Sequence, residues 1–229
     1  IDPQVKHVMD FTQIRENRSR VDLELRDSPL RKYFSPAMLC LYRALVPRLR
    51  DHASGKLLDA VVGVCPSRGR LTDLVTEYHS LDIEKRVPEV DLVADLQDMK
   101  PVISESYDVV LCTEVLEHVA QPEKLISEVW RILKPRGKFI LSVPYLSRLH
   151  EEPFDYFRFT HHGLQFLLTK SGFSVLEIVP TGSLFSFVGH QVSTVLVGTF
   201  WHVPVIKHCA FWLNALLLTL PCYSLDRLI

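Results

Sequence analysis

The sequence lacks the features that would place it in several common classes of protein. Its five cysteines include no C-x-x-C pair and stand in no His/Cys cluster with zinc-binding spacing: Cys40, Cys65, Cys112, Cys209 and Cys222. Such scattered cysteines are typical of reduced thiols, so we expect a cytoplasmic protein with no metal site. The formal net charge is −1, which leaves no basic surface for nucleic acid, and no signal-peptide pattern is present.

Glycine is also scarce at the point where a nucleotide-binding turn would need it. The first predicted strand leads into Val61-Val62-Gly63-Val64-Cys65, and Gly63 is the one glycine of that turn. Glycine is needed where the backbone approaches a ligand closely or takes a positive φ. The segment is therefore either a ligand-binding turn that has lost glycines or an ordinary loop after a strand.

Short apolar runs alternate with amphipathic stretches over the middle of the chain. Apolar runs without alternation are typical of parallel strands buried on both faces. Strand-helix-strand repetition predicts an α/β fold, a doubly wound and mostly parallel sheet. The predicted strands are Leu57–Val62, His79–Ile83, Leu92–Ala94, Tyr107–Thr113, Lys138–Val143 and Ser174–Val179. The predicted helices are Gly69–Thr76, Pro122–Leu133 and His161–Ser171, after an earlier one that Ser35 caps and Pro36 begins.

The composition divides the chain into three predicted segments. Residues 1–34 are charge-rich and irregular, as in a solvated arm or a set of short capping helices. Residues 35–182 hold the predicted sheet and its helices. Residues 183–229 form a hydrophobic helical appendage.

Acidic residues stand at the ends of two predicted strands, where doubly wound sheets bind their ligands. Asp82 follows the turn at the spacing of a carboxylate that accepts hydrogen bonds from two ribose hydroxyls, although a solvated strand end is the alternative. Asp95 could accept from an adenine amine while Leu96 packs on the ring, or Asp95 could cap a helix.

The segment from Tyr107 to Val119 carries the most specific pattern. After a buried strand, Glu114, Glu117 and His118 come within a few residues of its carboxyl end. Pro122 then begins a long amphipathic helix, which we expect to end in a turn at Leu133–Gly137. Glu117 and His118 could also act by bracing local backbone.

Together these segments resemble class I S-adenosylmethionine (SAM)-dependent methyltransferases of the methyltransferase type 11 group. The resemblance covers residues 56–179 and rests on LLDAVVG, LDIE, ADLQDM, YDVVLCTEVLEHV and ILKPRGKFILSVP. It implies a Rossmann-like fold, SAM as cofactor and transferase activity. By position it also implies a cofactor site: Asp59 and Gly63 at the methionine end, Asp82 at the ribose, Asp95 and Leu96 at the adenine, and Cys112, Thr113 and Glu114 along the wall.

The glycine turn departs from the pattern of that family. The usual D-x-G-x-G-x-G has Val61 and Cys65 in place of its first and last glycines. A Cβ at Val61 would crowd the cofactor carboxylate, and β-branched residues resist positive φ. The alternative to an active enzyme is therefore a non-catalytic interaction module. A nicotinamide-dependent dehydrogenase is a third reading, but the chain lacks G-x-G-x-x-G in that turn.

The loop from His150 to Thr160 resembles a loop that faces the methyl acceptor in one subset of the family. A neutral hydroxyl or amine acceptor needs a base, and the candidates are His150, His118 and Glu151. Alternatively, His150 and Asp155 pin the loop by hydrogen bonds. We expect a small-molecule or lipid-like acceptor and no nucleic acid partner.

The C-terminal tail has almost no ionised side chains. No Asp, Glu, Lys or Arg occurs from Ser183 to Ile206 or, beyond Lys207, up to Leu225. Gly198 and Pro204 interrupt the runs, so an interfacial helical hairpin in peripheral membrane contact fits better than spanning helices. A helix pair that covers the acceptor pocket or forms a homodimer face is the remaining alternative.

Overall fold

A computed structural model describes residues 20–21, 24–25, 28–60, 71–85 and 87–228. The chain divides into two compact units. We call Ala44–Pro180 the sheet unit, and Ile1–Arg43 together with Thr181–Ile229 the hairpin unit. The predicted turn with Val61, Gly63 and Cys65 lies outside the described residues.

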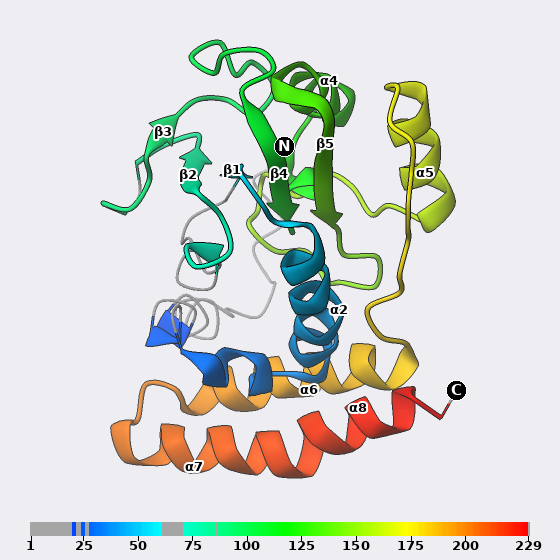
Figure 1. Cartoon of the computed structure of the whole chain (residues 1–229). Helices are drawn as coiled ribbons and strands as arrows, with labels where there is room; N and C mark the ends of the chain where they lie inside the picture. Colours follow the sequence, from blue (N-terminus) through cyan, green and yellow to red (C-terminus); the bar gives the residue numbers. More distant parts are fainter. Residues whose placement is uncertain (1–19, 22–23, 26–27, 61–70, 86, 229) are drawn as a thin grey trace, which may run out of the picture. The chain divides into compact units, whose positions relative to one another are not determined.

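The sheet unit is built on five parallel strands, which confirms the predicted fold class (Figure 1). Their order across the sheet is β3-β2-β1-β4-β5, so the chain reverses its direction of winding between β1 and β4. The strands are β1 Lys56–Ala60, β2 Glu77–Asp82, β3 Leu92–Val93, β4 Tyr107–Thr113 and β5 Leu133–Ser142.

Helices and loops bury both faces of this sheet. On one face, Leu58, Val110 and Cys112 pack with apolar residues of α4 (Pro122–Ile132) and α5 (His161–Lys170). On the other, Leu57 and Leu111 pack with the C-terminal half of α2 (Pro36–His52) and with Leu71. Burial on both faces explains why the strands read as continuous apolar runs.

The helix boundaries follow local capping chemistry. Ser35 Oγ accepts a hydrogen bond from Met38 N at 3.2 Å at the start of α2, as predicted. Thr160 Oγ1 does the same for Gly163 N at 3.0 Å at the start of α5. Gly172 ends α5 with φ 94°, a conformation that suits a residue without a Cβ.

Three predictions about local structure were wrong. Ser174–Val179 forms no strand: Leu176 is 81% exposed, and an ion pair of Glu177 with Arg48, not a backbone ladder, holds the segment. Residues 133–137, predicted as a turn, already belong to β5, where a register shift opposite Tyr107–Val109 accommodates the extra residues. The helix predicted up to Thr76 ends at Leu71, and its start lies outside the described residues.

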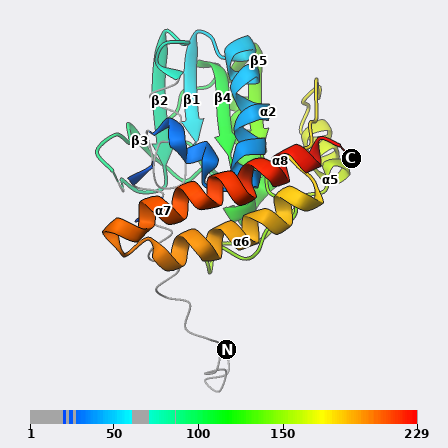
Figure 2. The same cartoon turned by 90° about the horizontal axis from the view of Figure 1, so that it is seen from below.

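The hairpin unit holds a short 3₁₀ helix and two antiparallel helical arms (Figure 2). The 3₁₀ helix, η1, is Pro29–Tyr33, and the first arm is α6, Leu184–Phe200. The second arm is continuous through α7 Pro204–Asn214, the π-helical turn η3 Ala215–Thr219 and α8 Leu220–Asp226. Asp226 closes the pair by accepting hydrogen bonds from the backbone N–H groups of Ser183, Phe185 and Ser186.

On the two arms, small side chains are buried and large apolar side chains are exposed, the reverse of the usual distribution in a water-exposed helix. The buried face of α6 consists mainly of small and hydroxyl residues: Ser186, Gly189, Ser193, Thr194, Val197 and Gly198. Large apolar residues are exposed on both arms, among them Val188, Val192, Leu196, Leu213, Leu216, Leu217 and Leu220. Asn214, buried in the second arm, donates from Nδ2 to Phe34 O at 2.9 Å. Ser193 Oγ and Asn214 Oδ1 are buried without a hydrogen-bond partner among the described residues.

Candidate functional site

The strand register brings the predicted site residues to one edge of the sheet. Ala60, the last residue of β1, lies beside Leu81 of β2 and Cys112 of β4. Thr113, the last residue of β4, lies beside Ser142 of β5. The carboxyl ends of four neighbouring strands therefore meet where a doubly wound sheet binds its ligand, next to the reversal between β1 and β4.

Asp59 is a buried carboxylate just before the end of β1. Its Oδ2 accepts a hydrogen bond from the Tyr78 hydroxyl at 2.6 Å, while Oδ1 has no hydrogen-bond partner among the described residues. Burial raises the pKa of Asp59 to about 7, and the Tyr78 hydrogen bond opposes this shift. A buried acceptor of this kind suits a ligand that brings a cationic or N–H donor.

Asp82 and Asp95 differ in their surroundings. Asp82 is buried at the tip of β2, and its Oδ1 accepts from Ile83 N at 2.6 Å. Asp95 is exposed and accepts from Gln97 N at 2.8 Å within a turn; no helix begins there, so the alternative role as a helix cap was wrong. Leu96 is buried in the core under the sheet. Their contacts with a cofactor remain predictions.

The predicted pocket wall at the end of β4 includes a residue buried in the core and a residue with a strained backbone. The Cys112 side chain is buried in the core, and burial raises the pKa of its thiol well above the usual range. Thr113 is half-buried. Glu114 has φ 55°, and its Oε1 accepts from Ser142 Oγ at 2.8 Å. Burial, and then the charge of Glu117, raises the pKa of Glu114 to about 7. Such a strained, buried acid is typical of a ligand site.

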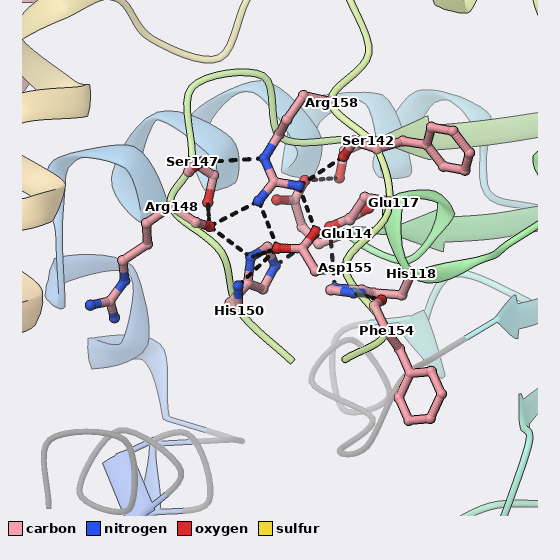
Figure 3. A network of polar contacts seen from close by, with 11 residues as sticks. Glu114, Glu117, His118, Ser142, Ser147, Arg148, His150, Phe154, Asp155 and Arg158 are labelled. Atoms are coloured by element: carbon pink, nitrogen blue, oxygen red, sulfur yellow. Dashed lines mark hydrogen bonds and ion pairs between the residues drawn. The ribbon is translucent and has the colours of Figure 1, made fainter. Parts of the chain in front are cut away.

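Two of the three candidate bases lie together beside a buried acid (Figure 3). His118 Nε2 lies 3.5 Å from Glu117 Oε1, and His150 Nε2 lies 3.7 Å from the same oxygen. The two imidazole rings meet edge to face with centroids 4.7 Å apart. Glu151, the third candidate, is exposed and outside this cluster.

The loop that carries His150 is held by a clamp between Asp155 and Arg158 (Figure 3). Arg158 donates to both carboxylate oxygens, at 2.6 and 2.8 Å, and its Nη2 also donates to Arg148 O at 2.9 Å. Asp155 Oδ2 accepts from His150 N at 2.8 Å. The predicted pinning of the loop by His150 and Asp155 is therefore confirmed. Chiefly through Arg158, the pKa of Asp155 is lowered to about 2.

The structure adds to the roles that the sequence indicated for these residues. Glu117 was weighed only as a brace, yet neither of its carboxylate oxygens has a hydrogen-bond partner among the described residues. Its backbone carbonyl does brace the loop, by accepting from Tyr156 N at 2.9 Å and Phe157 N at 3.3 Å. The spacing of Asp155 and Arg158 was the one signal for the clamp, because residues three apart can pair locally.

A comparison with protein families finds a match over residues 49–141, with the family described as a methyltransferase domain. Among curated relatives, the chain is 37% identical over 68 residues to the ubiquinone biosynthesis O-methyltransferase of Pseudomonas savastanoi pv. phaseolicola. The match covers 30% of this chain and 28% of that protein. The chain therefore spans less than a third of that relative's length.

Solved structures share the fold at low identity. A complex between the Haloferax volcanii Trm112 methyltransferase activator and a methyltransferase matches with a TM-score of 0.55 and 19% identity, covering 72% of this chain and 78% of that one. The [4+2]-cyclase SpnF matches with a TM-score of 0.54 and 16% identity, covering 82% and 77%. At such identities the likeness concerns the fold alone, and the name of the second protein indicates a different chemistry.

Proposed function

Because the chain carries a methyltransferase domain over residues 49–141, we propose that it is a SAM-dependent methyltransferase acting on a small-molecule or lipid-linked acceptor. The observation that carries this proposal is the buried Asp59 carboxylate, whose Oδ1 has no hydrogen-bond partner among the described residues. It lies in β1, next to β2 with Asp82, at the edge where these sheets bind ligands. The described residues thus fit a cofactor that has an ammonium group and a ribose.

The bound cofactor would supply an activated methyl group for in-line displacement. Asp59 would face its ammonium group, and Asp82 would accept from the ribose hydroxyls. The clamped loop would position the acceptor, since most of the rate in such a reaction comes from alignment. His150 is the first candidate to accept the acceptor's proton, because its ring lies on that loop beside Glu117.

Calorimetry with SAM and S-adenosylhomocysteine tests the cofactor assignment. Micromolar binding of either is expected, and a transfer assay with radiolabelled SAM and extracted lipids would then seek the acceptor. No binding at millimolar ligand would contradict the enzyme and favour the second candidate, a non-catalytic interaction module. Val61→Gly then separates the causes: binding restored by this change would identify a turn damaged by substitution.

The exposed apolar face of the hairpin unit supports a lipid-linked acceptor. Small residues buried between helices and large apolar residues outside are the arrangement of helices packed in lipid. Pro204–Asp226 is long and apolar enough to cross a membrane, with a mean hydropathy of 1.4 and 22% of that window buried. We propose peripheral contact, in which the outer faces of α6 and α7–α8 lie in the headgroup region.

Liposome flotation tests this contact. The parent chain is expected to float with phosphatidylcholine–phosphatidylglycerol vesicles, and Leu217→Glu, at a 72% exposed position, is expected to reduce the floating fraction. Ile103→Glu makes the same change at a 78% exposed position in the sheet unit and is the matched control. Equal flotation of all three proteins, or none, would contradict membrane contact through the hairpin.

A further inference from the structure

Glu117, His118 and His150 form a compact set of possible metal ligands. One donor atom from each lies within 4.8 Å of the other two. Glu117 Oε1 is 3.5 Å from His118 Nε2 and 3.7 Å from His150 Nε2. Around a tetrahedral Zn²⁺ with bonds of about 2.0–2.1 Å, neighbouring ligand atoms stand roughly 3.3 Å apart. The side chains are therefore already near the spacing that a metal ion requires.

The partners of both rings orient Nε2 toward the centre of this set. His118 Nδ1 lies 2.8 Å from Phe154 O, and a carbonyl only accepts, so the proton of the neutral ring belongs on Nδ1. His150 Nδ1 lies 3.2 Å from Arg148 O and 3.4 Å from Asp155 Oδ2, which are also acceptors. Metal-binding histidines are typically held in this way, with one ring nitrogen donating to a carbonyl or carboxylate.

The buried carboxylate of Glu117 is only partly compensated, since Arg158 interacts with it electrostatically but makes no hydrogen bond to it. The residue is fully buried, and neither carboxylate oxygen has a hydrogen-bond partner in the part of the chain that the structure describes. An ionised carboxylate in such a position is costly unless a proton or a cation compensates it. A neutral His118 in the tautomer fixed by Phe154 directs a lone pair toward Glu117, so it supplies no proton.

We propose that Glu117, His118 and His150 bind one divalent transition-metal ion, with Zn²⁺ as the best fit to the donor set and spacing. Three protein ligands leave an open position for water or for an oxygen atom of a ligand. In the sequence these ligands come from two separate segments and include no cysteine, so their spacing matches no zinc motif and no metal site was expected. The clamped loop brings His150 to the pair that follows β4.

This site and the general base exclude each other. A metal bound at Nε2 occupies the lone pair with which His150 or His118 would accept a proton. In the metal-bound protein, a hydroxyl bound at the open position would instead lose its proton to solvent more readily, since the metal lowers its pKa. The alternative to a bound metal is a protonated imidazole, which would compensate the charge of Glu117 by forming an ion pair with it.

Metal titration of the chelator-treated 229-residue chain decides between a bound metal and a protonated imidazole. Calorimetry with ZnCl₂ is expected to show one equivalent bound with micromolar affinity or tighter, and CoCl₂ is expected to give a saturable visible absorption. Glu117→Gln and His150→Ala should each weaken binding by at least about 100-fold. Asp155→Asn keeps all three ligands and should weaken it by about 10-fold, the lower end of effects from residues that orient a ligand.

The double variant His161→Ala/His162→Ala is the matched control, since these exposed adjacent histidines have ring centroids 3.8 Å apart and could bind metal adventitiously. It should bind like the parent chain. No saturable binding at millimolar metal would overturn the site. The site would also be overturned if metal binding survived both ligand substitutions or was lost in the control variant. Melting curves without metal identify the folded variants, and none of these readouts depends on SAM binding or methyl transfer.

Discussion

Replacing Asp155 with Asn should loosen the loop from Ser147 to Arg158 by a calculable amount. The Arg158 hydrogen bonds lower the pKa of Asp155 from 3.8 to about 2. At 1.36 kcal/mol per pKa unit, ionised Asp155 stabilises the closed loop by about 2 kcal/mol. Its side chain is only 1% exposed, so screening by solvent reduces this value little. Asn cannot be ionised and would lose most of that contribution.

Hydrogen exchange of the loop amides measures this loss directly. At pH 7, the amides of residues 147–158 should exchange about 30-fold faster in Asp155→Asn, the equivalent of about 2 kcal/mol. His150 N is the first amide to compare, because it donates to Asp155. The control is Asp98→Asn, which breaks an ion pair with Lys100 whose side chains are 53% and 81% exposed. Exposed pairs contribute little, so exchange should not change there.

The pH dependence of the same measurement tests the cause. A lowered pKa in the folded state means stabilisation that is complete above the unfolded value of about 4 and is lost as pH falls toward 2. The difference between the parent chain and Asp155→Asn should therefore shrink to about a third at pH 2.5. Equal exchange of the two proteins at pH 7, or an undiminished difference at pH 2.5, would refute the reasoning.

Three further predictions concern the sheet unit. Asp82→Ala should weaken SAM binding about 100-fold in calorimetry, since it removes two hydrogen bonds to a carboxylate; unchanged affinity would refute the ribose role. Asp59 has a pKa raised to about 7, so its charge costs stability as pH rises from about 4 to 7. In urea unfolding, the free energy of unfolding of Asp59→Asn should exceed that of the parent chain by on the order of 3 kcal/mol at pH 8. At pH 4 the two free energies should be equal. Gly55→Ala should destabilise by about 2 kcal/mol, because φ is 65° and a Cβ would lie 2.7 Å from Asp108 Cγ, whereas Gly163→Ala should melt like the parent chain.

The sheet could be predicted because its strands are short, apolar and bounded by polar residues. Tyr107–Thr113 is predicted to the residue, since burial on both faces leaves an apolar run between Asp108 near its start and Thr113 at its end. Ser174–Val179 reads the same way but forms no backbone ladder with any strand among the described residues. A strand depends on a partner backbone as well as on its own side chains, and local sequence does not encode that partner.

The site was predictable only in part, for a similar reason. The carboxylates Asp59 and Asp82 stand at strand ends, so topology alone brings them to one edge. The approach of His150 to Glu117 depends on how a long loop folds back, and the hydrogen bonds that fix it involve backbone groups. That the buried Glu117 carboxylate lacks a hydrogen-bond partner among the described residues emerges only when its three-dimensional surroundings are known.

The clamp between Asp155 and Arg158 has a consequence for how such a protein can diversify. Arg158 and Asp155 shape the loop through contacts within the loop itself, and its backbone is tied to the β4 side through the carbonyl of Glu117 and the contact of Phe154 O with His118. A carbonyl is present whatever the side chain. Substitutions between residues 151 and 154, which leave Asp155 and Arg158 in place, can therefore reshape the surface above the strand ends without disturbing the sheet. The selectivity for an acceptor can therefore change through this part of the loop while the stability of the sheet is retained.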